Sequence, residues 1–253
     1  MPRYDFRSPR LFVAGPLAEG TSVTLEAAQT NYLVNVLRLK AGATVLVFNG
    51  RDGEWRAELA AAGNKKKAVL DLAERTREQT PPGDLHYLFS PLKHARLDYM
   101  VQKVVEIGVS QLQPIVMRHT QAERVNLGRM RANAIEAAEQ CGVLNIPEIA
   151  EPKKFESLTR GWRAERLLVF CDEEADVRDP AAALASARGG GIAGALPVSV
   201  LIGPEGGFAD SERAALLKLP NVVRLALGPR ILRADTAAVA ALTLVQAVLG
   251  DWR

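Results

Sequence analysis

The sequence predicts an α/β protein in which a small β-rich domain precedes a larger domain built on a mostly parallel sheet. Several short β-branched segments surround one short helical segment in the first 74 residues. A polar stretch ending in Pro-Pro-Gly at residues 81–83 then breaks the pattern, as a linker does. After it, apolar strand-like runs alternate with helix-like stretches, which is typical of a parallel sheet covered on both faces. We therefore expect domains at residues 1–74 and 84–253, joined by a linker at 75–83.

The N-terminal part carries the turn and hairpin signals of a small β-barrel. Residues Asn31–Leu39 place apolar side chains at helical spacing, and Arg38 and Lys40 follow where cations suit the end of the helix dipole. The turn cluster at residues 49–53 joins two strands into a hairpin. The predicted strands are residues 10–13, 21–25, 44–48, 54–60 and 68–72.

The second part alternates strands with helices. Apolar residues recur at i, i+3, i+4 and i+7 from Leu97 to Val104, the pattern of a helix with one buried face. Residues 127–142 are rich in alanine and predict a second helix. The apolar segment Thr236–Gly250 predicts a buried helix that is too short for a membrane span and carries Gln246. The predicted strands are residues 85–89, 112–117, 167–170, 198–202 and 222–227.

Charge and cysteine content limit the classes of function. The formal net charge is +3, and the whole excess lies in the first 75 residues, which is compatible with phosphate contacts there. Cys141 and Cys171 are far apart and lack metal-binding spacing, so we expect reduced thiols in a cytoplasmic protein. We expect no membrane segment.

Familiar cofactor motifs are missing or out of context. Residues 189–194 match G-x-G-x-x-G, but no strand precedes them and no helix opens after them, so we expect a loop and no nicotinamide cofactor. The three histidines, His86, His94 and His119, have neither metal-ligand spacing nor an evident nucleophile partner. We expect no metal and interpret these histidines as ordinary surface or core residues.

The most informative stretch is Val198–Phe208, a short buried strand that ends abruptly in one proline and three glycines. Glu205 is its one carboxylate, and Asp210 or Ser211 is expected to cap a helix that starts near Glu212. Ligands of α/β sheets bind beyond the carboxyl ends of strands, so this turn is a candidate binding loop. The alternatives are a turn without a ligand, and a Glu205 that only satisfies backbone N–H groups nearby.

A second stretch, Leu225–Thr236, repeats this design. A strand ends at Leu227, a Gly-Pro pair turns the chain, and a loop with Arg230 and Arg233 leads into the last helix, capped by Asp235 or Thr236. Two such loops at one sheet edge form a pocket of backbone donors and acceptors, which suits a flat adenine and a ribose. The alternative for the two arginines is a pair of ion bridges to nearby acids.

Together, residues 202–208 (Ile-Gly-Pro-Glu-Gly-Gly-Phe) and 227–233 (Leu-Gly-Pro-Arg-Ile-Leu-Arg) resemble the signature of the RsmE family. These are 16S rRNA (uracil-N3)-methyltransferases of the SPOUT, or α/β-knot, superfamily. The resemblance extends over most of the chain. Further matching segments are residues 35–40, 102–109 with Pro114, and 136–140.

The resemblance implies a PUA-like RNA-binding β-barrel followed by an α/β domain with a deep trefoil knot. It further implies S-adenosyl-L-methionine as cofactor, bound in a bent shape, a homodimer formed across the knotted region, and 16S rRNA of the small ribosomal subunit as partner. Two other functions stay open. One is a SPOUT methyltransferase that modifies a ribose 2′-O or guanine N1, and the other is a non-catalytic RNA-binding or ribosome-assembly protein.

The resemblance also implies site residues. Arg233 is expected to stabilise negative charge on the uracil carbonyls, and Glu205 to orient the base or the cofactor or to accept a proton. Expected cofactor-binding residues are Leu201, Ile202, Gly203, Pro204, Gly206, Gly207, Leu227, Gly228, Ile231, Leu232 and Thr236. Expected RNA-binding residues are Arg38, Lys40, Lys93, Arg96, Lys103, Arg129, Arg131 and Arg230. The five from Lys93 to Arg131 are named for their positive charge and position as a track for phosphates, and the alternative for each is a solvated surface role.

Three positions depart from the family pattern. Asn31-Tyr32 stands where the family often has histidine, and Val143 where it commonly has arginine. Residues 234–236 read Ala-Asp-Thr in place of the more usual Thr-Glu-Thr, so Asp235 keeps the charge on a side chain that is one methylene shorter.

Overall fold

The computed structural model describes residues 5, 7–61, 67–122, 124–188 and 196–252. The G-x-G-x-x-G match at 189–194 lies outside these residues. By contacts the chain divides into two units, one of residues 1–81 with 138–146 and one of residues 82–137 with 147–253.

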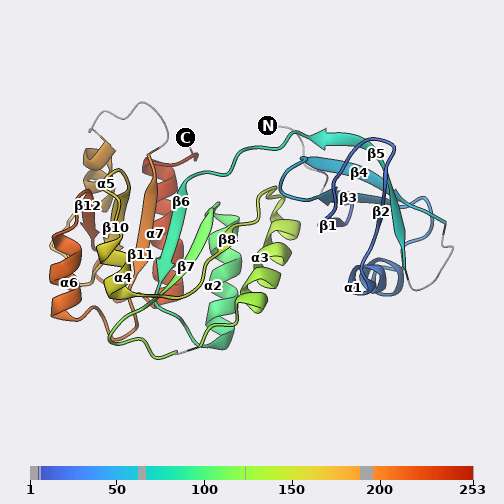
Figure 1. The fold of residues 1–253 in the computed structure, drawn as a ribbon. Coiled ribbons are helices and arrows are strands. Elements are labelled where there is room, and N and C mark those ends of the chain that lie inside the picture. The colour runs from blue at the N-terminus through green and yellow to red at the C-terminus, as the bar shows by residue number, and fades with distance from the viewer. Residues whose placement is uncertain (1–4, 6, 62–66, 123, 189–195, 253) are drawn as a thin grey trace. The chain divides into compact units, whose positions relative to one another are not determined.

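The first unit is built on a five-stranded sheet with strand order β1-β3-β4-β5-β2 (Figure 1). The strand bounds are β1 Arg10–Phe12, β2 Ser22–Thr24, β3 Thr44–Phe48, β4 Glu54–Leu59 and β5 Val69–Arg77. Strands β3, β4 and β5 form an antiparallel meander, and β1 pairs with β3 in parallel. The predicted strands are confirmed, and the last of them continues five residues further than expected.

The helical segment of this unit differs from the prediction for residues 31–39. It begins earlier, as α1 (Ala27–Asn31), and continues as a π-helical turn, η1 (Tyr32–Val36). Leu33 is fully buried and fixes this turn on the core of the sheet. Arg38 then has a φ of 55°, which ends the helix before Leu39.

The second unit holds a parallel sheet with strand order β12-β10-β11-β6-β7-β8, and β9 also pairs with β7. Its strands are β6 Leu85–Phe89, β7 Gln111–Val116, β8 Glu148–Ile149, β9 Lys153–Lys154, β10 Leu167–Cys171, β11 Val198–Ile202 and β12 Val222–Leu225. Every described pairing in this sheet is parallel, as predicted. The two-residue strands β8 and β9 were not predicted, because so short a segment has no periodicity.

Helices cover the sheet on both faces. Helix α7 contacts α2 and α5 on one face, and α4 and α6 contact each other on the other face (Figure 1). The bounds are α2 His94–Glu106, α3 Leu127–Cys141, α4 Phe155–Arg160, α5 Pro180–Arg188, α6 Asp210–Leu217 and α7 Ala234–Val248. All five residues of β11 are buried, as expected for a central strand between two helical layers. Within the described residues no helix is long and apolar enough to cross a membrane.

The register of three neighbouring strands brings their carboxyl ends together. Cys171, the last residue of β10, pairs with Ile202, the last of β11, and with Leu225, the last of β12. The loops that follow these strands therefore start side by side at one edge of the sheet.

Candidate functional site

The three loops after β10, β11 and β12 enclose a cavity of about 590 Å³. This volume lies within the range of small-molecule sites in proteins. Its lining combines backbone-rich turns with a few charged side chains. The lining residues are Cys171, Asp172, Glu173, Ile202, Gly203, Pro204, Glu205, Gly206, Gly207, Phe208, Leu227, Gly228, Pro229, Arg230, Ile231, Leu232, Arg233, Ala234 and Ala237.

Most of the predicted site residues lie together in this cavity. The two predicted catalytic residues, Glu205 and Arg233, line it, as does Arg230. Two predicted cofactor residues lie elsewhere. Leu201 is fully buried in the core beneath α4 and α6, because alternate residues of a strand face opposite sides of the sheet. Thr236 is exposed on the first turn of α7 and does not line the cavity.

The loop after β11 is compact because its glycines leave no room for side chains. A Cβ on Gly203 would lie 2.9 Å from the ring of Phe208. Gly207 has a φ of 73°, and a Cβ there would lie 2.7 Å from Glu173 Oε1. Phe208 is buried and meets Phe170 edge-to-face at 5.8 Å, so the loop ends on a core aromatic residue.

The caps of both following helices differ from the prediction. Helix α6 begins at Asp210 with Ala209 as its N-cap, and the backbone N–H of Ala209 donates to Glu212 Oε2 at 3.0 Å. Asp210 and Ser211 are therefore first-turn residues and not caps. Glu212 also accepts from the backbone N–H of Arg118 at 2.8 Å, which ties α6 to the loop after β7.

Helix α7 begins at Ala234 with Arg233 as its N-cap, two or three residues before the predicted caps. Asp235 lies in its first turn, where a negative charge suits the helix dipole. The carbonyl of Arg233 accepts from the N–H of Ala237 at 2.7 Å. Arg233 is thus the junction between the second Gly-Pro loop and the last helix.

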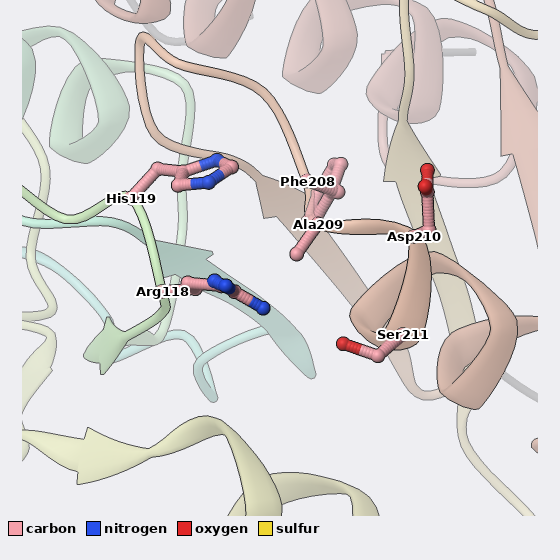
Figure 2. A pocket seen from close by; sticks show the side chains of 6 residues that line it. All are labelled: Arg118, His119, Phe208, Ala209, Asp210 and Ser211. Carbon is pink, nitrogen blue, oxygen red and sulfur yellow. The ribbon is translucent and has the colours of Figure 1, made fainter.

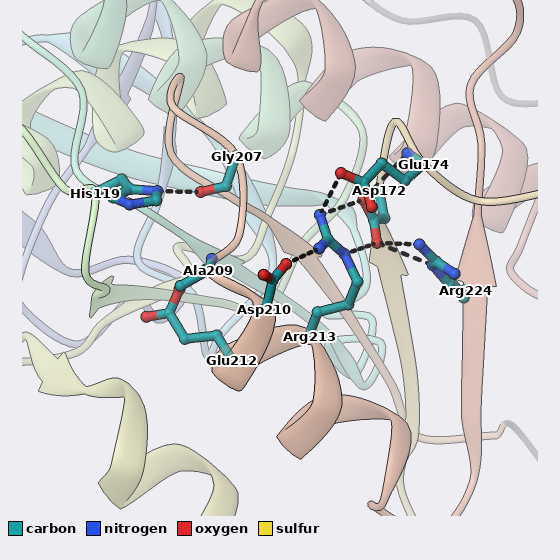
Figure 3. Close-up of polar contacts among 9 residues, drawn as sticks. All are labelled: His119, Asp172, Glu174, Gly207, Ala209, Asp210, Glu212, Arg213 and Arg224. Atoms are coloured by element: carbon teal, nitrogen blue, oxygen red, sulfur yellow. Dashed lines mark hydrogen bonds and ion pairs between the residues drawn. The ribbon is translucent and has the colours of Figure 1, made fainter.

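A buried ion network lies beside the cavity (Figure 3). Asp172 Oδ2 accepts from Arg213 Nε at 2.8 Å and from Arg224 at 2.9 Å (Nε) and 2.7 Å (Nη2). Burial acts to raise the pKa of Asp172. Hydrogen bonds from Arg213, the Glu174 N–H and Arg224 outweigh burial, so the pKa lies below its ordinary value. The carboxylate is charged at neutral pH.

Cys171 lines the cavity without being a nucleophile. Burial, together with the charge of Asp172, raises the pKa of its thiol to about 12. The thiol is therefore protonated at neutral pH, and a protonated thiol is a poor nucleophile.

A second cavity, of about 460 Å³, shares Phe208 with the first. It is lined by Arg118, His119, Phe208, Ala209, Asp210 and Ser211 (Figure 2). His119 Nδ1 lies 3.1 Å from the carbonyl oxygen of Gly207, so its N–H donates to the turn that lines the first cavity. His119 was interpreted as an ordinary histidine. Its place just after the carboxyl end of β7 was the signal that could have singled it out.

The predicted RNA-binding residues fall into two groups. Arg129 forms two hydrogen bonds to Asp98, at 2.8 and 2.5 Å, and Lys103 pairs with Glu106 at 2.6 Å. The remainder are exposed, namely Arg38, Lys40, Lys93, Arg96, Arg131 and Arg230.

Sequence reasoning missed seven cavity residues, and three of them are consecutive in the chain. Cys171 is the last residue of β10, a strand that the sequence did predict, and Asp172 and Glu173 directly follow it. The end of β10 lies beside the ends of β11 and β12 because β10 is between them in the sheet. The sequence does not give this strand order, so the residues at the end of β10 were not assigned to the site. The other missed residues are Phe208, Pro229, Ala234 and Ala237. Within the described residues no cluster of His, Cys, Asp and Glu forms a candidate metal site.

Comparison with known proteins identifies the family to which the chain belongs. The RNA methyltransferase domain model matches residues 79–246, and the RNA methyltransferase PUA domain model matches residues 25–72. Curated relatives called ribosomal RNA small subunit methyltransferase E include one from Rickettsia conorii, 26% identical over 94% of both chains. Another, from Synechocystis sp., is 29% identical over 95% of this chain and 78% of the relative.

Solved structures agree in fold. A putative methyltransferase from Legionella pneumophila, in complex with the bound cofactor SAM, matches with a TM-score of 0.80 and 26% identity, covering 95% of this chain and 98% of that one. A ribosomal RNA small subunit methyltransferase E from Neisseria gonorrhoeae matches with a TM-score of 0.79 and 24% identity, covering 98% and 100%. The α/β fold with an N-terminal PUA domain and the resemblance to the RsmE family are thus confirmed. The chain belongs to the RNA methyltransferase domain family.

Proposed function

We propose that this protein transfers a methyl group from S-adenosyl-L-methionine to N3 of a uridine in the 16S rRNA of the small ribosomal subunit. The observation that carries the proposal is the cavity formed by two Gly-Pro loops at aligned strand ends. The names of the curated relatives and the SAM complex of the Legionella protein support it.

The residues of the cavity fit this cofactor. Backbone groups at Gly203, Gly206, Leu227 and Leu232 offer donors and acceptors for adenine and ribose, and the volume of about 590 Å³ accommodates a nucleoside with a short side chain. The carboxylates lining the cavity suit a ligand that carries positive charge. When bound, S-adenosyl-L-methionine supplies a methyl group activated by a sulfonium charge.

We assign the chemistry of the acceptor to Arg233 and Glu205. The N3 proton of uracil is weakly acidic, so methyl transfer needs the deprotonated base to be favoured and held in line. The exposed guanidinium of Arg233 stabilises negative charge developing on the uracil carbonyls. Glu205 orients the base or the cofactor, or accepts the N3 proton. Because N3 is paired in a duplex, the uridine must be unpaired or flipped out.

The second cavity supports an RNA-facing side of the site. Arg118 and His119 line this second cavity, which shares Phe208 with the cofactor cavity (Figure 2). Arg96 on α2 and Arg131 on α3 are also exposed, and we assign them to contacts with RNA phosphates. Arg129 and Lys103 already hold acidic partners, so we expect them to contribute less to phosphate binding. In the PUA unit, Arg38 and Lys40 are the proposed contacts.

The assembly and cellular place of the protein complete the proposal. We propose a homodimer formed across a deeply knotted C-terminal domain, acting in the cytoplasm, with domains at residues 1–74 and 84–253. Ile231 is apolar, lines the cavity and is 92% exposed. An apolar residue this exposed favours a contact with a second subunit or with the substrate. Analytical ultracentrifugation tests the dimer, and a monomer at micromolar concentration would contradict it.

The decisive experiment is methyl transfer to small ribosomal subunits from a strain that lacks this enzyme. Nucleoside mass spectrometry of the product is expected to show 3-methyluridine. A 2′-O-methylated nucleoside or 1-methylguanosine would favour a different SPOUT target. Absence of S-adenosyl-L-methionine binding in isothermal titration would favour a non-catalytic RNA-binding protein. Arg233→Ala and Glu205→Ala test the site, and wild-type rates for both would refute its assignment.

A further inference from the structure

Asp172 is the most deeply buried charged group at the cavity, and the proposed reaction does not use it. Its side chain is 0% exposed, although it follows directly on the last residue of β10. Two guanidinium groups and the backbone N–H of Glu174 donate to it. A buried carboxylate with this many donors has little capacity left to receive a proton or a ligand. Its role therefore has to be exerted through its partners.

The two arginines come from the elements that flank the two Gly-Pro loops. Arg213 lies in α6, which follows the loop at residues 203–209. Arg224 lies in β12, three residues before Leu227 and the loop at residues 227–233. The backbone N–H of Asp172 also donates to the carbonyl of Leu225 at 2.9 Å. One carboxylate thus joins the exit of one loop to the entrance of the other (Figure 3).

The outer contacts of Arg213 reinforce this arrangement. Arg213 also pairs with Asp210 at 3.0 Å and with Glu174 at 3.3 Å. Glu174 and Asp210 are exposed, so their ion pairs with Arg213 contribute little to stability. The buried Asp172 is therefore the partner that holds Arg213 in place. A buried carboxylate with several hydrogen bonds allows its donors few positions. Helix α6 and strand β12, which carry Arg213 and Arg224, are therefore held in fixed positions relative to Asp172.

We propose that Asp172 is a positioning residue that couples the two Gly-Pro loops through Arg213 and Arg224 and so sets the shape of the cofactor cavity. The inference rests on the proposed function, because it assumes that these loops hold S-adenosyl-L-methionine. Loosening either arginine is expected to weaken cofactor binding without touching the ligand. Losing both is expected to cost less than the product of the single effects, because both act through one carboxylate.

The test is titration of the full-length protein with S-adenosyl-L-methionine in Arg213→Gln, Arg224→Gln and the double variant. In each single variant Asp172 keeps one cationic partner, so the protein is expected to fold. We expect the Kd to rise about tenfold in each single variant. In methyl transfer, the KM for the cofactor is expected to rise more than kcat falls. Arg224→Lys keeps the charge and is expected to recover part of the affinity.

Arg166→Gln is the matched control. Arg166 also has a largely buried side chain that forms an ion pair, with Asp84, but it lies at the opposite end of β10, away from the cavity. We expect it to lower Tm as much as the test variants while changing the Kd less than about twofold. The proposal is overturned if the wild type binds and Arg213→Gln and Arg224→Gln bind equally well, or if Arg166→Gln weakens binding to the same extent. A wild-type protein that does not bind S-adenosyl-L-methionine would instead overturn the proposed function.

Discussion

The two Gly-Pro loops are alike in sequence and unlike in structure. The loop at 203–209 packs onto the core through buried Phe208 and is held by Glu212 and His119 at its far end. In the loop at 227–233, Arg230, Ile231 and Arg233 are all exposed. For residues 228–232 of this second loop the described part of the chain provides no hydrogen bond. One loop is packed against the core on both sides of the exposed Glu205, and the other leaves three large side chains exposed.

This difference assigns separate tasks to the loops. A wall that is formed before the ligand arrives lowers the ordering cost of binding, whereas exposed side chains are available to an acceptor base. Substitutions in the first loop, apart from the exposed Glu205, are therefore expected to change stability and cofactor affinity. Substitutions in the second are expected to change the rate of methyl transfer.

The largest effect is expected for Arg233→Ala, in the exposed loop. Removing a group that stabilises charge in the transition state typically lowers kcat by roughly 10²–10³. Because Arg233 is exposed at the N-cap of α7, the fold and cofactor affinity are expected to remain. Steady-state methyl transfer with small subunits measures kcat, and titration with S-adenosyl-L-methionine measures affinity. If the Kd for S-adenosyl-L-methionine rose by the same factor as kcat fell, Arg233 would be a cofactor-binding residue and would not act on the uracil.

Phe208→Ala is expected to give the largest stability effect, in the packed loop. Truncating a buried phenylalanine typically costs about 3–5 kcal/mol, and here it also removes the edge-to-face contact with Phe170. Ile231→Ala is the matched change in the exposed loop and is expected to stay within about 0.5 kcal/mol. Urea denaturation measures both. Equal losses would show that the second loop is packed as tightly as the first.

Gly207→Ala separates backbone strain from side-chain crowding in the first loop. The φ of 73° is strained for alanine and costs about 1 kcal/mol, which we expect to appear in the free energy of unfolding. The new methyl group would also meet the flexible end of Glu173. In a Glu173→Ala background the cost is expected to persist, since the strain remains. If Gly207→Ala cost no stability in the Glu173→Ala background, crowding against Glu173 alone would explain why this position needs glycine.

The sequence could predict these loops because glycine, proline and buried strand residues leave local signatures. The predicted bounds of β11 match the structure, and the predicted start of α6 and the predicted end of β12 each differ from it by two residues. It could not predict the helix caps, since Ala209 and Arg233 are unusual in that role and the acceptor for the Ala209 N–H is Glu212. Nor could it predict the Asp172 network, because Asp172, Arg213 and Arg224 are distant in sequence and meet only through the strand order.

Acid pH is expected to have the smallest effect, and it bears on the network that joins the two loops. The pKa of Asp172 in the folded protein lies below its ordinary value of 3.8, because donors from Arg213, Glu174 and Arg224 outweigh burial. Its stabilising contribution is therefore complete above pH 3.8 and is lost as the pH falls through the lower folded pKa. Above that window the contribution does not change with pH.

The wild type and the Arg213→Gln/Arg224→Gln variant isolate this contribution, since other acids titrate in both proteins. Without its two cationic partners, Asp172 keeps its burial, which raises the pKa, and the Glu174 N–H, which lowers it, but loses both guanidinium donors. The stability difference between the two proteins is then expected to shrink as the pH is lowered from about 5 through 3.8 and below, because Asp172 is protonated at a higher pH in the variant than in the wild type. Urea unfolding across this range measures the difference. A difference that stays constant with pH would mean that the arginines stabilise the loops without Asp172, and the two loops would then be fixed independently.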